Sequence, residues 1–215
     1  MKYFFIIFLF PFLLHAQSEY MDSSYFGLGA GYSYSGSEKF DGNEGSLGLS
    51  ILGMFDLGFQ WGKSRISESA VSASANSFYL AYNAKIKNNK NCFKILIGYI
   101  NETITPGQYN DIKASGLVLG FNFLIKISQT ENFTLMPELG LSYGFLSVDN
   151  NNPYSYNDNS EFDDTRNISL SLNYKADLSK TVHIIFDPTI SKDLLNSDNP
   201  LMLGIGVGLL LNTVH

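Results

Sequence analysis

Two residues near the end of the chain have types and a spacing that could do chemistry. Asp177 and His183 flank a short polar break, Ser179-Lys180-Thr181. If that break is a turn, the carboxylate faces the imidazole across two antiparallel strands, about 5 Å apart at Cβ. An acid–histidine pair is two-thirds of a nucleophilic triad. The local sequence places no serine beside the pair, so we interpret it as a structural ion pair and expect no catalytic residues and no enzyme.

Two other stretches could bind a ligand. Residues 149–166 contain several carboxylates, which are ligands that Ca²⁺ prefers, but their spacing lacks the pattern of a calcium-binding loop. The run GLGAG at 27–31 could cradle a phosphate only if a helix followed it, and here the alternation of residue types simply continues. We therefore expect a solvated acidic loop, no metal site and no cofactor.

The elements that must position Asp177 and His183 show apolar residues at every second position. In residues 167–178 one face carries Ile168, Leu170 and Leu172, and the other carries Asn167, Ser169 and Ser171. A period of two predicts extended strands, and two such runs around a short break predict a hairpin. Similar alternation marks segments 26–34, 47–61, 78–86, 93–99, 117–127, 133–145, 182–190 and 201–211.

The number of strands depends on residues 47–61. A three-residue turn at Leu52-Gly53-Met54 would keep the alternation in phase, and so would one long strand. Splitting there gives ten strands, in which short turns (52–54, 88–91, 128–132, 179–181) alternate with long polar loops (36–46, 62–75, 101–114, 149–166, 191–200). An even strand number and this asymmetry of connections are typical of outer-membrane barrels, so ten strands are favoured, with eight as the alternative.

The composition of the two strand faces indicates which one looks inward. Every apolar face is free of charge, and the opposite faces are rich in Gly, Ser and Asn. A soluble barrel would display a face rich in Lys and Glu, whereas a membrane barrel turns its apolar face to lipid and its polar face to the lumen. The sequence therefore predicts an all-β fold, a closed antiparallel up-and-down transmembrane barrel spanning residues 24–212, because closure satisfies every backbone group in lipid.

The ends and the composition define the remaining expectations. Residues 1–16 have one Lys, a long apolar run and Ala16 before Gln17, which is typical of a cleaved secretory signal, and residues 17–23 form a polar leader. The only cysteine is Cys92, so no disulfide framework is expected. The net charge of −6 and the lack of a basic stripe argue against a nucleic-acid partner.

Charged residues of the strands lie on the predicted lumen face, where they could line a small polar pore or pair into a plug. A barrel of this size has little space beyond its own side chains, which favours the plug. Lys85 and Lys94 are expected to oppose each other across the turn at 88–91. The predicted lumen network is Asp56, Lys85, Lys94, Lys126, Glu138, Lys175, Asp177, His183 and Asp187.

The signal, the period-two strands with Gly-rich lumen faces and the run PELGLSYGF at 137–145 together resemble small OmpA/OmpX-type outer-membrane β-barrels, the porin-family proteins of Gram-negative bacteria. The resemblance implies location in the cell outer membrane among its lipid and lipopolysaccharide, and delivery by the barrel-assembly machinery. It implies a structural, surface-interaction or minor small-solute pore role. The alternatives are a lipid-modifying or proteolytic barrel enzyme, and a soluble secreted barrel that binds an apolar ligand.

Overall fold

The computed structural model describes residues 26–66, 70–86, 91–106, 111–130, 132–150, 161–195 and 200–213. The predicted signal and leader, residues 1–23, lie outside these ranges. The strands are β1 (Phe26–Gly36), β2 (Phe40–Ile51), β3 (Phe55–Ile66), β4 (Val71–Ile86), β5 (Asn91–Pro106), β6 (Ile112–Ile125), β7 (Ser128–Thr130), β8 (Phe133–Asn150), β9 (Glu161–Asp177), β10 (Val182–Asp193) and β11 (Met202–Asn212).

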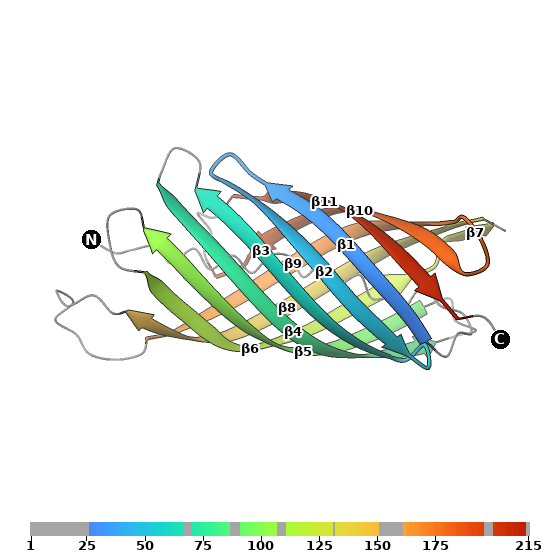
Figure 1. The fold of residues 1–215 in the computed structure, drawn as a ribbon, viewed down its shortest axis with the longest axis horizontal. Helices are drawn as coiled ribbons and strands as arrows, with labels where there is room; N and C mark the ends of the chain where they lie inside the picture. The colour runs from blue at the N-terminus through green and yellow to red at the C-terminus, as the bar shows by residue number, and fades with distance from the viewer. Residues whose placement is uncertain are drawn as a thin grey trace.

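Ten of these strands form a closed, antiparallel, up-and-down barrel, as the sequence predicts. Each strand pairs with its neighbour in the chain, β6 pairs with β8, and β1 pairs with β11 to close the cylinder. Figure 1 shows this closing seam, with β1 in blue beside β11 in red. The three-residue strand β7 pairs only with the start of β8 and is not one of the ten strands of the barrel wall.

The register of the ladders defines the tilt of the strands. Ladder partners can be followed around the barrel in two directions from Leu210 on β11. The route through β1 and onward to β8 reaches Thr165 on β9, and the short route through β10 reaches Asp177 on the same strand. The stagger is therefore 177 minus 165, or 12 residues. With ordinary strand spacings, ten strands with this stagger tilt by about 40° and enclose a cylinder of about 10 Å backbone radius. The oblique strands are visible in Figure 1.

The predicted split of residues 47–61 is confirmed at Leu52-Gly53-Met54. Leu52 and Gly53 have φ angles of 55° and 60°, and the Met54 amide donates to the Ile51 carbonyl at 3.1 Å. Two successive positive φ angles belong to the turn that best matches the twist of a β-hairpin. Gly adopts this conformation freely, whereas Leu adopts it at a cost.

The predicted long loops are wrong in extent, because the strands continue into them. The connections between paired strands shrink to 37–39, 67–70, 107–111, 151–160 and 194–201, and 37–39 is as short as the turn at 52–54. Residues beyond the apolar segments lose their alternation but still pair with a neighbouring strand, as Asp41 does with Arg65. Likewise, the predicted turn at 128–132 contains β7, and Asn91 of the predicted turn at 88–91 already belongs to β5.

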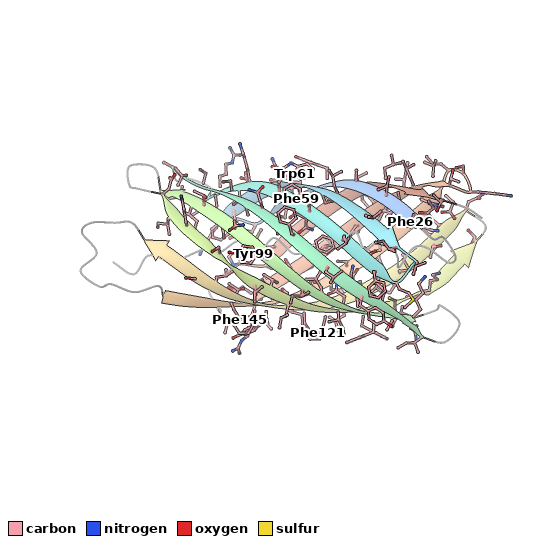
Figure 2. All side chains as sticks on the ribbon, turned by 60° about the horizontal axis from the view of Figure 1, so that its bottom comes forward. Phe26, Phe59, Trp61, Tyr99, Phe121 and Phe145 are labelled. Atoms are coloured by element: carbon pink, nitrogen blue, oxygen red, sulfur yellow. The ribbon has the colours of Figure 1, made fainter. Side chains whose placement is uncertain are left out.

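The two faces of the wall lie as the alternation predicts. Phe26, Leu28, Tyr32, Trp61 and Phe78 are among the large apolar side chains that are 43–61% exposed on the outside, and Figure 2 shows labelled aromatic side chains projecting from the wall. Residues of the opposite face are buried in the lumen. Across the described ranges, no helix is long and apolar enough to cross a membrane.

The lumen contains apolar as well as polar side chains. Three buried clusters lie within it: Ala75, Ile100, Val118 and Leu146; Met136, Ile185 and Leu210; and Tyr79, Ala81 and Leu96. Glycines make room for the bulkiest of these, since a Cβ added to Gly58 would lie 2.0 Å from the Tyr79 ring. The interior is therefore a packed core with polar groups inside it.

Candidate functional site: the barrel lumen

The predicted lumen residues separate into a buried group and a group near the short-turn end. Asp56, Lys94, Glu138, Lys175, His183 and Asp187 are buried. Lys85, Lys126 and Asp177 are half-buried, and Lys126 lies just past the end of β6. Lys85 does not oppose Lys94: the ladder pairs Lys85 with Cys92, and Lys94 with Asn83. The connection at 87–90 sets a register two residues away from the expected one, which keeps every side chain on its predicted face.

Glu138 occupies the centre of a polar group in the middle of the lumen. Its carboxylate accepts hydrogen bonds from the side-chain amides of Asn122 and, at 2.8 Å, Asn173. Lys94 on β5 interacts electrostatically with it, and so does Asp187 on β10. One cation thus lies among carboxylates and amides that come from several strands. Buried charges are tolerated when they are paired and hydrogen-bonded in this way.

Neighbouring carboxylates have their own neutral partners. The Asn83 side chain donates to Asp56 at 2.9 Å and accepts from the Cys92 thiol at 3.8 Å. The Thr189 hydroxyl donates to Asp187 at 3.1 Å and lies 2.8 Å from the Ser171 hydroxyl. Sequence reasoning missed these amides and hydroxyls because they carry no charge. Their positions on the same inward faces as the acids were the signal that could have found them.

The predicted acid–histidine pair exists and belongs to a larger group at the short-turn end. Asp177 pairs with His183 in the ladder, and its carboxylate accepts a hydrogen bond from the imidazole Nδ1. Lys175 Nζ lies 3.1 Å from the same carboxylate oxygen. On the other side, the Asn212 amide nitrogen lies 3.0 Å from His183 Nε2. The Asn212 side-chain amide is therefore within hydrogen-bonding distance of Nε2.

This arrangement engages both ring nitrogens of His183. A general base needs one nitrogen directed at a nucleophile or a water, whereas here Nε2 faces the Asn212 amide and Nδ1 is hydrogen-bonded to the Asp177 carboxylate. Asn212 was missed from the sequence, because its place beside β10 depends on a register set beyond a long connection. The group joins the last three strands, β9, β10 and β11, and its geometry suits a structural role.

Several lumen side chains within the described ranges are completely buried. Lys94, Val118 and Leu210 are each 0% exposed, although they come from three different strands. A water-filled channel would leave its lining in contact with water. A small cavity of about 20 Å³ lies beside Glu44, Gln60 and Ser77, where the Ser77 hydroxyl donates to Gln60 at 3.1 Å. The described residues include no group of three or more His, Cys, Asp or Glu side chains that could hold a metal ion.

Comparisons with known proteins support the fold. No protein-family model matches the chain, and no curated protein matches it. The translocator domain of the autotransporter NalP from Neisseria meningitidis is similar in structure, with a TM-score of 0.56 and 12% identity over 87% of this chain and 88% of that one. Neisserial surface protein A gives a TM-score of 0.46 with 13% identity, over 89% of this chain and 99% of that one. The β domain of the Bordetella autotransporter BrkA gives 0.49 with 9% identity, over 89% and 100%.

At these identities the likeness is one of fold. The chain is a closed ten-stranded β-barrel of the kind that outer-membrane proteins have. The resemblance drawn from the sequence is therefore supported for outer-membrane barrels in general, and the narrower OmpA/OmpX grouping stays a prediction.

Proposed function

We propose that this chain is a non-catalytic protein of the bacterial outer membrane, whose barrel acts as a rigid, sealed anchor for structural or surface-interaction roles. In this proposal the apolar outer wall contacts lipid and lipopolysaccharide, and the barrel-assembly machinery inserts the chain. The short-turn end then faces the periplasm, and the opposite end of the barrel faces potential surface partners.

One observation carries the proposal: the burial of the two faces is inverted relative to a soluble protein. Charged groups such as Lys94 and Asp56 are buried inside, while Phe78 is 61% and Leu28 is 59% exposed outside. Burying apolar area is the main favourable term in folding, so such a wall requires an apolar surrounding. Hydrocarbon is that surrounding for a closed barrel, since no strand edge is left unpaired.

The sealed interior favours an anchor over the small-solute pore. Apolar side chains fill the lumen at two separate clusters, with the hydrogen-bonded polar group around Glu138 as a further obstruction. A barrel of about eight strands has room for side chains and little else, and ten strands enlarge it only modestly. The two engaged nitrogens of His183 support a structural histidine rather than a hydrolytic one.

Fractionation of cells that express the full chain tests the location. We expect the protein in the outer-membrane fraction, resistant to extraction by alkaline carbonate, with a gel mobility that changes when the sample is boiled. A closed barrel stays folded in cold detergent and unfolds on heating, which causes that change. Recovery from the soluble periplasm without detergent would show that the wall does not face lipid, and the proposal would then fail.

Planar-bilayer recordings test the sealed lumen separately. We expect the inserted protein to show no steady conductance, because lumen side chains such as Val118, Leu146 and Leu210 are almost completely buried. A stable ohmic step for each inserted molecule would establish the pore role instead. The heat-dependent gel mobility verifies insertion in the same sample. An absence of conductance therefore cannot be confused with failed insertion.

A further inference from the structure

An open apolar groove of about 840 Å³ runs along the outer wall over the first five strands and their neighbours. Its sides are two adjacent outward rows of the sheet, one through Ala30, Leu47 and Phe59 and the other through Leu28, Leu49 and Leu57. Its floor is the backbone of the inward row between them, which is glycine on three successive strands: Gly29, Gly48 and Gly58. Ala30 is the smallest side chain of the outward rows and leaves a notch between Leu47 and Leu209.

Beyond Phe59, on one side of the groove, the outward face of β3 carries an aromatic side chain and then cations. Outward positions of β3 read Phe59, Trp61, Lys63 and Arg65 in order. The Phe59 and Trp61 rings stack with centroids 5.7 Å apart. Trp61 also lies over β2 at Gly45, where an added Cβ would be 2.4 Å from its ring. Figure 2 shows Phe59 and Trp61 together on the outer wall. Trp at such a boundary marks the level of lipid headgroups.

Polar groups surround Lys63 just beyond that boundary. Asn43 and Ser74 are its ladder partners on the two flanking strands, and all three side chains are exposed. Asp41 is engaged by Arg65, whose Nε lies 2.7 and 2.9 Å from its two carboxylate oxygens. That pair cancels its own charge, so Lys63 supplies the positive charge next to Trp61. Lys63 is about 13 Å along the strand from Phe59.

We propose that this face is a binding site for a membrane lipid with acyl chains and an anionic phosphate headgroup. The acyl chains lie in the groove over Gly29, Gly48 and Gly58, and the phosphate meets Lys63, with Asn43 and Ser74 as further hydrogen-bonding groups. The proposal rests on the proposed function, since it requires this wall to face lipid. Charge complementarity selects the occupant: an apolar groove with a lysine beyond one of its sides matches an amphiphile with a negative head.

The only tryptophan of the chain, Trp61, reports on the site directly. The protein is inserted into phosphatidylcholine vesicles that contain a small fraction of brominated lipid, which quenches an adjacent tryptophan. Brominated phosphatidic acid is compared with brominated phosphatidylcholine at equal mole fraction. We expect phosphatidic acid to be enriched about fivefold beside Trp61, the effect of one well-placed lysine near a membrane surface.

Matched variants distinguish a specific lipid site from a general electrostatic attraction between the protein and anionic lipid. Lys63→Gln is expected to abolish the enrichment, and Lys192→Gln, which removes an exposed outward lysine on β10, is expected to leave it unchanged. Ala30→Phe fills the notch and is expected to lower the enrichment. Ala176→Phe, the same change at an outward position of β9, is expected to have no effect.

Each other outcome overturns a defined part of the account. Equal quenching by the two brominated lipids in the unaltered protein would overturn the lipid site and leave membrane insertion intact. Equal losses in Lys63→Gln and Lys192→Gln would assign the enrichment to surface charge and overturn the site. An unchanged enrichment in Ala30→Phe would remove the groove from the proposal. If neither lipid quenches Trp61, the wall is not in lipid, and the proposed function fails together with this inference.

Discussion

At the scale of single residues, Gly58 leaves room in the lumen for the Tyr79 ring. An added Cβ would lie 2.0 Å from the Tyr79 ring, which is itself buried. We expect Gly58→Ala to lower the free energy of unfolding by about 1–3 kcal/mol, as overpacking does. Gly204→Ala is the control, because its Cβ would meet no atom closer than 3.7 Å. Urea unfolding in vesicles measures both. In a Tyr79→Ala background the cost of Gly58→Ala should shrink, and full additivity would contradict the contact.

Also at the residue scale, Lys94 balances carboxylates in the middle of the lumen. It is fully buried and interacts with Glu138, which two asparagine amides also bind. We expect Lys94→Met to lower the free energy of unfolding by about 3–5 kcal/mol, since it leaves buried charge without its cation. The double variant Lys94→Met with Glu138→Met should recover much of that loss, because both charges are then gone. A double variant as unstable as the sum of the single ones would contradict this coupling.

At the scale of elements, the turn between β2 and β3 holds a leucine in a conformation that suits glycine or asparagine. Leu52 has a φ of 55° and is largely exposed. We expect Leu52→Asn to raise the free energy of unfolding by about 1 kcal/mol, the typical cost of left-handed backbone for an ordinary residue. Gly53→Ala, at a φ of 60°, should lower it. Thermal or urea unfolding compares the two, and a loss of stability in Leu52→Asn would contradict the turn conformation.

Much of each strand could be predicted from sequence, and the reason is visible in β9 and β2. From Ile168 to Tyr174 the apolar and polar residues alternate strictly, because one side chain in two lies on the apolar outer face and the next lies in the lumen. Residues 40–46 of β2 carry no such alternation, yet they pair fully with β3. Beyond the apolar segments a residue need only form backbone hydrogen bonds to the neighbouring strand, and every residue except proline has both the donor and the acceptor for them. Predicted loops were therefore too long.

For the candidate site, the sequence predicts which residues lie on the lumen face, but it does not predict which of their side chains contact each other. The alternation places Lys94, Glu138 and His183 on the lumen side, where they lie. Which groups meet depends on register, and register depends on connections whose geometry the sequence does not define. The pairing of Lys94 with Asn83 and the approach of Asn212 to His183 both follow from such connections. The glycine-floored groove arises in the same way, from ladder positions that align only after folding.

At the scale of the whole molecule, the proposed sealed membrane barrel has lipid around its wall and side chains that close its lumen. Single cysteines at each position from Ile168 to Asn173, in a Cys92→Ala background, can carry a spin label in vesicles. Collision with dissolved oxygen reports lipid, and collision with a water-soluble nickel chelate reports water. The background change removes the only native thiol, which is buried.

This scan tests the central claim most directly. We expect oxygen collisions to peak at Ile168, Leu170 and Leu172, with a period of two, and labels at Ser169, Ser171 and Asn173 to meet little of either reagent. Nickel collisions that peak at Ile168, Leu170 and Leu172 would show that the apolar wall faces water. Nickel collisions that peak at the other three positions would show an open, water-filled lumen. Either result would contradict the sealed membrane barrel.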